Sequence, residues 1–179
     1  MHYRAHSVAA CACVSVLFAS LTHAQTQPGA YHLGPGDRVS ITVLGESDLS
    51  MEVRIPQSGV LPYPLLGDVR IEGLTIDELE QLITEGLKGP YLVEPRVAIT
   101  LVAFRPLVVR GAVQRPGDVV YQDGLTIAGA IALAGGFTGR ASRSRIEVIR
   151  ALDPARVVIG SLSTPVFPGD IITVSPGLL

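Results

Sequence analysis

The most informative segment of the sequence runs from Leu107 to Arg150 and reads LVVRGAVQRPGDVVYQDGLTIAGAIALAGGFTGRASRSRIEVIR. Apolar residues alternate from Leu107 to Val113, which predicts a strand with one buried face. A Pro-Gly-Asp turn and a second short strand follow, and apolar side chains then recur at helical spacing over residues 127–134. Thr126 is placed to cap this helix, and Gly135 can close it in the left-handed conformation. The order strand, turn, strand, helix, strand predicts a small module with both helix and sheet.

The preceding part of the chain predicts a second module built from the same parts. A Pro-Gly-Asp turn at residues 35–37 leads into an alternating apolar run at 39–43, which is typical of a half-buried strand. The clearest helix spans residues 76–87, where Thr75 and Glu78 form a capping box and the apolar residues Ile76, Leu79, Leu82, Ile83 and Leu87 make one stripe. Another alternating strand follows at 97–103.

Two short motifs recur in both halves of the chain. Pro-Gly-Asp occurs at residues 35–37, 116–118 and 168–170, each time before a β-branched run, and Gly-Leu-Thr-Ile occurs at 73–76 and 124–127, each time before a helix. Preference for turn and cap residues can explain such repetition by itself. The alternative is two small domains, each a short mixed sheet with one helix packed on it, with a boundary near Phe104 to Pro106. We therefore predict an α+β protein with domains at 28–104 and 107–175.

The first 24 residues have the features of a cleaved secretory signal. Arg4 precedes an apolar run from Val8 to Leu21, which is too short to span about 30 Å of hydrocarbon. Thr22 and Ala24 supply small residues at the two positions that a signal peptidase reads, so we expect cleavage between Ala24 and Gln25. Acylation at Cys11, within Val-Ala-Ala-Cys, is disfavoured because only seven residues precede this sequence.

Removal of residues 1–24 takes away most of the residue types used in catalysis. No cysteine would remain in the mature chain, and His32 would be its one histidine, which excludes cysteine nucleophiles and disulfides and leaves His32 alone for a triad or a zinc site. No spacing of carboxylates selects an acid and base pair, and no phosphate-binding loop is present. With Arg4 lost, 13 basic residues face 16 acidic ones, so a net charge of −3 does not favour nucleic acid. We expect a protein that is not an enzyme, with no catalytic residue, no metal site and no cofactor.

Basic residues concentrate in the segment from Arg140 to Arg145, directly after the Gly-rich end of the second helix. A solvated loop is the default interpretation of such a run. The functional alternative is a basic rim that meets an anionic polymer, because the arginine fork suits carboxylate groups. Arg140, Arg143 and Arg145 are therefore the candidate polymer contacts.

Three groups of residues resemble the polysaccharide biosynthesis/export domain of outer-membrane capsule and exopolysaccharide export proteins. They are Tyr31 to Asp37, then Val60 to Gly67 with Gly73-Leu74-Thr75, then Tyr91-Leu92 with Pro95-Arg96-Val97. In the second half, Val108 to Gly117 and Leu125 to Gly136 are similar to the SLBB domain, a soluble-ligand-binding β-grasp module that follows it in those proteins. The resemblance implies two β-grasp-like domains.

The resemblance also implies a function in polysaccharide export. It implies a homo-oligomeric ring in the periplasm, associated with the outer membrane, through which a polysaccharide chain passes without any bond being made or broken. The implied partners are an inner-membrane co-polymerase of the tyrosine-kinase type and a separate outer-membrane β-barrel pore. Larger members end in a membrane-crossing helix that this sequence lacks after its last strand, so we expect a ring-forming conduit or a periplasmic adaptor to such a pore.

Two other classes of function stay open at this point. One is a periplasmic scaffold that binds polysaccharide or regulates the synthesis machinery without transporting polymer; unlike a conduit, it could work as a monomer. The other is a secreted hydrolase, which the lack of a nucleophile and of metal ligands disfavours.

Overall fold

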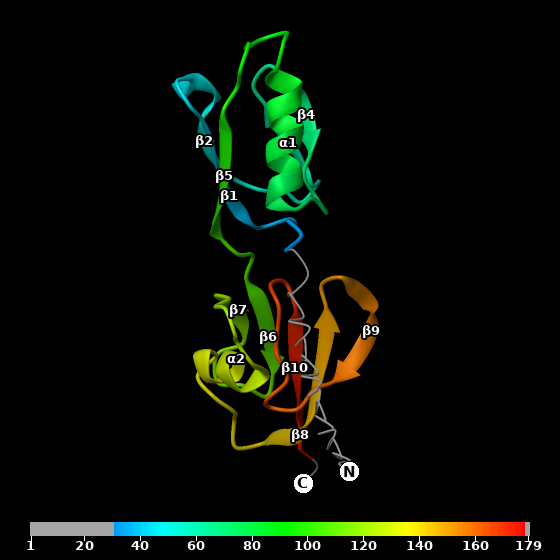
Figure 1. Ribbon diagram of the computed structural model, residues 1–179. Helices are drawn as coiled ribbons and strands as arrows, with labels where there is room; N and C mark the ends of the chain where they lie inside the picture. Colours follow the sequence, from blue (N-terminus) through cyan, green and yellow to red (C-terminus); the bar gives the residue numbers. More distant parts are fainter. Residues whose placement is uncertain (1–30, 178–179) are drawn as a thin grey trace, which may run out of the picture.

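Two small domains follow one another along an elongated molecule and meet at a narrow waist (Figure 1). The structure is a computed structural model that describes residues 31–177. The predicted signal segment, its cleavage site at Ala24 and Gln25, and Cys11 lie outside the described residues. Each domain has its own apolar core, one built from residues between Leu33 and Ile99 and the other from residues between Leu107 and Val174. The α+β class with two domains, predicted from the sequence, is confirmed.

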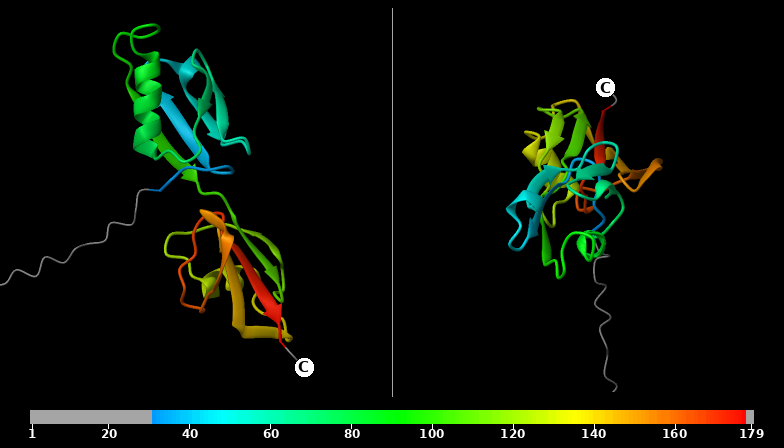
Figure 2. Two further views of the ribbon diagram at one scale, coloured as in Figure 1. Left: turned by 90° about the vertical axis from the view of Figure 1, so that its right-hand side faces the viewer. Right: turned by 90° about the horizontal axis from the view of Figure 1, so that it is seen from above.

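The first domain packs one long helix and a small hairpin against a three-stranded sheet. The sheet has the order β2-β1-β5, and the hairpin is formed by β3 and β4. The elements are β1 (Arg38–Val43), a short 3-10 helix η1 (Ser47–Leu49), β2 (Met51–Arg54), β3 (Val60–Tyr63), β4 (Gly67–Arg70), α1 (Ile76–Leu87) and β5 (Val97–Ala103). All of its strand pairs are antiparallel, so the predicted mixed sheet is wrong for this domain. The reason is that α1 carries the chain to the distal end of the domain, and β5 must run back beside β1 (Figure 2).

Local sequence signals determine the ends of α1. The Thr75 hydroxyl accepts a hydrogen bond from the backbone N–H of Glu78, while the Glu78 carboxylate accepts one from the backbone N–H of Thr75, as the capping box predicts. The buried face of the helix consists of Leu79, Ile83 and Leu87. Leu82, which the predicted stripe included, is 40% exposed, because it lies at the edge of the face that the sheet covers.

The second domain is a five-stranded mixed sheet with α2 on one face. Its strand order is β7-β6-β10-β8-β9, and β10 pairs parallel to β6 and antiparallel to β8. The elements are β6 (Leu107–Gly111), β7 (Gly117–Val119), α2 (Ile127–Leu133), β8 (Ala141–Arg150), β9 (Asp153–Ile159) and β10 (Ile171–Pro176). Thr126 caps α2, and Gly135 follows it with a φ of +83°, as predicted.

Two features of this domain differ from the sequence-based expectations. The basic segment expected as a solvated loop lies in strand after its first residue, since Arg140 is in a turn and β8 begins at Ala141, which pairs with Pro176 of β10. The edge strand β9 was not anticipated, because Pro154 and the exposed side chains of this segment hide the usual alternation. The β8–β9 hairpin extends from the sheet to the waist (Figure 1).

Candidate functional site

Two Pro-Gly-Asp turns meet at the waist, and each places a carboxylate in the protein interior. Asp37, directly before β1, is 0% exposed, and Asp170, directly before β10, is 1% exposed. They are the only buried polar or charged residues within residues 31–177. The third turn differs, because its aspartate, Asp118, is exposed on β7. Burial of a charge costs free energy unless the group is paired and hydrogen-bonded, so the partners of the two buried aspartates define the junction.

Asp37 is surrounded by hydrogen-bond donors from both sides of the domain boundary. Its carboxylate accepts from the backbone N–H of Gly34 at 2.8 Å and from the Tyr31 hydroxyl, which lies 2.8 Å from each oxygen. Arg105, in the segment between β5 and β6, donates its backbone N–H at 2.6 Å and its Nη1 at 3.3 Å. Burial, followed by the hydrogen bond to Asp37, raises the pKa of Tyr31 well above its usual value of 10.0.

Arg105 joins the two turns. Besides its bond to Asp37, its Nε donates to the carbonyl oxygen of Pro168, in the turn before β10, at 3.2 Å. Its guanidinium lies over the Tyr31 ring, 5.7 Å from the ring centre. Two glycines leave room for it: a Cβ on Gly34 would overlap Nη1, and a Cβ on Gly169 would lie 2.8 Å from Nε. Arg105 is thus fitted between the domains.

Asp170 repeats this arrangement within the second domain. It accepts from the backbone N–H of Phe167 at 2.9 Å and of Ala151 at 3.2 Å, and from Nη1 of Arg150 at 2.6 Å. The same Nη1 lies 3.1 Å from the carbonyl oxygen of Pro165, and the guanidinium lies 5.1 Å from the centre of the Phe167 ring. The ion pair holds the end of β8 against the turn that starts β10.

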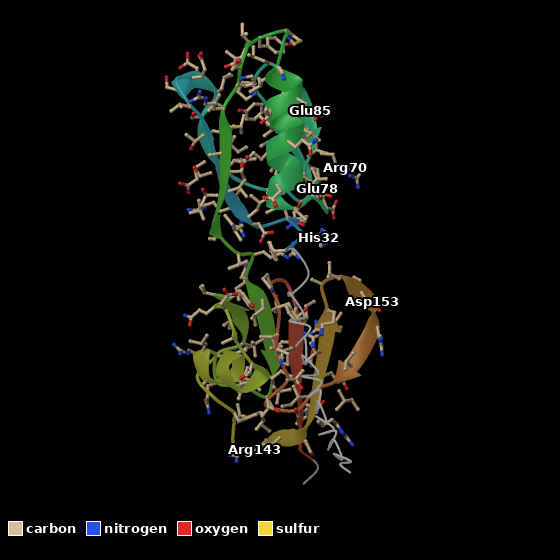
Figure 3. The ribbon with its side chains drawn as sticks, viewed as in Figure 1. His32, Arg70, Glu78, Glu85, Arg143 and Asp153 are labelled. Atoms are coloured by element: carbon tan, nitrogen blue, oxygen red, sulfur yellow. The ribbon has the colours of Figure 1, made fainter. Side chains whose placement is uncertain are left out.

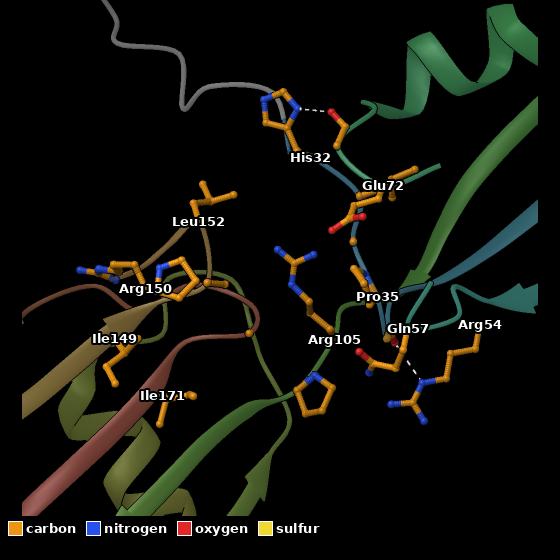
Figure 4. Close-up of a pocket in the computed structure, with 18 of the residues that line it drawn as sticks. His32, Pro35, Arg54, Gln57, Glu72, Arg105, Ile149, Arg150, Leu152 and Ile171 are labelled. Atoms are coloured by element: carbon orange, nitrogen blue, oxygen red, sulfur yellow. Dashed lines mark hydrogen bonds between the residues drawn. The ribbon is translucent and has the colours of Figure 1, made fainter. Parts of the chain in front are cut away.

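Two adjoining hollows open at the waist, and the tip of the β8–β9 hairpin contributes to both. The first, of about 670 Å³, lies between His32, Glu72 and the end of β2 at Arg54 in the first domain and second-domain residues such as Ile149 and Ile171 (Figure 4). The second, which we call the Phe167 hollow, has about 660 Å³. Its side chains include Tyr31, Arg105, Arg150, Leu152, Arg156, Val158 and Phe167.

The side chains that line these hollows are suited to binding a ligand. Guanidinium donors, aromatic rings and aliphatic side chains line them, and the His32 Nδ1 lies 2.9 Å from the carbonyl oxygen of Gly73. Among residues 31–177, no three His, Cys, Asp or Glu side chains are grouped so that they could hold a metal ion. The arrangement therefore suits a ligand held by hydrogen bonds and apolar contact.

The cations that the sequence singled out lie elsewhere. Arg143 lies at the end of the second domain remote from the waist, with its guanidinium 5.7 Å from the centre of the Phe137 ring (Figure 3). Arg140 and Arg145 flank it and are also exposed. Their contact with polymer stays a prediction. Sequence reasoning missed Arg105, Arg150 and Arg156; the signal that pointed toward the junction was the repeated Pro-Gly-Asp motif.

Charge is distributed unequally between the two domains. Residues 31–104 carry five basic and eleven acidic side chains, a net charge of −6, whereas residues 105–177 carry eight arginines and five acidic side chains, a net charge of +3. The waist is the boundary between the two, and the arginines at the Phe167 hollow belong to the basic part. No helix within the described residues is both long and apolar enough to cross a membrane.

Comparison with known proteins gives matches over both domains. The family model described as polysaccharide biosynthesis/export protein matches residues 25–102, and the SLBB domain model matches residues 108–162. The exopolysaccharide production protein ExoF of Rhizobium meliloti (strain 1021) is 32% identical over 94 residues. That alignment covers 50% of this chain and 22% of ExoF, so the chain spans only a small part of the length of this relative.

Proposed function

Because this chain belongs to the polysaccharide biosynthesis/export family, as its sequence motifs predicted, we propose that it exports an exopolysaccharide or capsular polysaccharide from the cell. The observation that carries this proposal is the order of the two matched domains in one chain, an export domain followed by an SLBB domain. The relative ExoF, an exopolysaccharide production protein, supports the same process.

In this proposal the protein is a subunit of a periplasmic ring associated with the outer membrane. It works as a conduit for polymer or as an adaptor that passes polymer to a separate pore, with an inner-membrane co-polymerase as its partner. It makes and breaks no bond, which agrees with family models that describe an export protein. Arg105 supports such a role, because a ring needs domains held at a fixed angle and Arg105 ties both turns of the waist together.

The test is the location of polysaccharide in a strain that lacks the gene. We expect polymer to be lost from the cell surface while its amount inside the cell stays normal or rises. Complementation with the full chain should restore surface polymer. Unchanged surface polymer, in a strain without a second copy of the gene, would refute the proposal and leave the scaffold alternative.

The ring is tested separately on the purified full chain. Mass photometry or sedimentation should give a closed oligomer of defined mass rather than a monomer. If the protein stays monomeric at all concentrations and is still needed for surface polymer, the conduit is refuted and the scaffold alternative is supported.

A further inference from the structure

The Phe167 hollow presents arginine N–H groups that no atom of residues 31–177 accepts. Arg105 donates through Nε and Nη1, so both hydrogens of its Nη2 have no acceptor within residues 31–177. Arg150 donates through Nη1 alone, which leaves Nε and Nη2. The Arg156 side chain has no hydrogen bond or ion pair to any other described residue. These groups belong to three different parts of the fold, and all three line one hollow.

Acceptors at the same hollow are already occupied. The carboxylate of Asp170 accepts from three donors and is 1% exposed, and that of Asp37, behind Arg105, accepts from four N–H or O–H groups. These two carboxylates hold the guanidiniums in place without reaching a ligand. Asp153 is the one exposed carboxylate among the lining residues. A ligand in the hollow therefore meets fixed donors, which suit a carboxylate because the planar guanidinium matches its geometry.

Apolar surface surrounds these donors. The Phe167 ring is 52% exposed and Leu152, at the tip of the β8–β9 hairpin, is 81% exposed. Tyr31, Val158 and Pro168 complete the wall. The C–H faces of a sugar ring pack against such surfaces, and about 660 Å³ lies within the range of about 300–1,000 Å³ of small-molecule sites.

We propose that the Phe167 hollow is a binding site for a carboxylate-bearing sugar, a uronate residue of the exported polymer. The carboxylate binds the free N–H groups of Arg150 and Arg156, and the sugar ring lies against Phe167 and Leu152. The proposal rests on the proposed function, since it takes the ligand to be polysaccharide. It goes beyond that function by specifying that the bound sugar is negatively charged and that it binds in the Phe167 hollow.

Binding is tested with the purified full chain and two matched probes, a trisaccharide of galacturonic acid and its methyl ester. The ester keeps every ring and loses every charge. We expect millimolar binding of the acid, seen as shifts of the Phe167 and Ala151 amide signals in an NMR titration, and at least fivefold weaker binding of the ester. Binding of the acid should weaken as salt rises from 50 to 300 mM, because exposed charges are screened.

Variants separate this site from the rest of the surface. Arg156→Gln should weaken binding of the acid about threefold to tenfold, as expected for one hydrogen bond at an exposed position, while Arg96→Gln, at the distal end of the first domain, should change it less than 1.5-fold. Phe167→Ala should weaken binding of both probes. Arg143→Gln tests the alternative rim at the remote end of β8.

The outcomes decide between the two sites. Equal binding of acid and ester, an equal effect of Arg156→Gln and Arg96→Gln, or a loss confined to Arg143→Gln would overturn the proposal. A folded protein that binds neither probe would also overturn it. None of these results would affect export, which is measured in the deletion strain, so failure of the site and failure of the proposed function are distinguishable.

Discussion

Replacement of Arg105 by alanine should lower the free energy of unfolding more than replacement of any exposed arginine. The variant loses the ion pair with Asp37, in which the Nη1 lies 3.3 Å from Oδ2 with 14% of the arginine side chain and none of the aspartate exposed. It also loses the bond from Nε to the carbonyl oxygen of Pro168. Removal of one partner of a buried ion pair costs about 3–5 kcal/mol.

The magnitude is reduced because Asp37 keeps other donors. The backbone N–H groups of Gly34 and of residue 105 and the Tyr31 hydroxyl still bind its carboxylate in the variant. The remaining loss is the guanidinium hydrogen bond to the carboxylate, about 1.5–3 kcal/mol, and the guanidinium hydrogen bond to the neutral carbonyl oxygen of Pro168, about 1 kcal/mol. We therefore expect Arg105→Ala to cost about 3 kcal/mol.

The assay is urea unfolding of the full chain at pH 7, followed by far-UV circular dichroism because the chain has no Trp. Arg38→Ala is the control, since its ion pair with Glu52, at 3.5 Å, is about half exposed on both sides and should contribute less than about 0.5 kcal/mol. Gly34→Ala provides a second test: the three atoms nearest to its Cβ all belong to the guanidinium of Arg105, so it should displace this group and cost about 1–2 kcal/mol.

One result would refute this reasoning. If Arg105→Ala and Arg38→Ala unfold at the same urea concentration as the wild type with the same slope, the contact between the turns does not stabilise the protein. A loss in Arg105→Ala without any loss in Gly34→Ala would assign the effect to the aliphatic stem of the arginine rather than to its charge.

Three further predictions concern single residues. Tyr31→Phe should lower stability at pH 7 by about 1–2 kcal/mol, because it removes the hydrogen bond to Asp37. Since folding raises the Tyr31 pKa, the stability of the wild type should fall as the pH rises above 10. This alkaline loss, measured by thermal melts from pH 8 to 12, should be smaller in the variant. Hydrogen bonds from the backbone N–H and then the hydroxyl of Thr75 lower the pKa of Glu78, so their contribution is present above the ordinary pKa of 4.5 and lost in more acidic solution. Thr75→Ala removes only the hydroxyl, so it should cost about 1 kcal/mol at pH 7 and reduce, without abolishing, the loss of urea-derived stability between pH 5 and 3. Gly111→Ala should cost more than about 2 kcal/mol in the same urea assay, because its φ is +90° and a Cβ would overlap a carbonyl oxygen of β10.

Elements of the fold that rest on neighbouring residues could be predicted from the sequence. The capping box of α1, the left-handed glycine after α2 and the turn at Pro35 and Gly36 all depend on groups within four positions of one another. The family could be predicted as well, because its motifs are local turns and caps in a fixed order. Strand β9 could not, since an exposed edge strand needs no apolar alternation.

The candidate site could be predicted only in part. The Pro-Gly-Asp repeats identified the turns, but not that two of their three aspartates would be buried. The density of arginines along the sequence pointed to Arg143 and its neighbours, whereas the arginines of the waist are widely spaced and have no common motif. Proximity in sequence is a poor guide to which cations share a surface, because a strand such as β8 carries its two ends to opposite ends of a domain.

The two domains, their helices and caps, and the family can all be read from the amino-acid sequence, since each depends on short-range hydrogen bonds and on the period of apolar side chains. Which charges meet at the waist depends on how the whole chain folds. Asp37 and Arg105 are 68 positions apart, and their contact exists because β5 returns the chain to the place where β1 begins. A buried carboxylate must find donors wherever the fold supplies them, and that choice depends on the path of the whole chain.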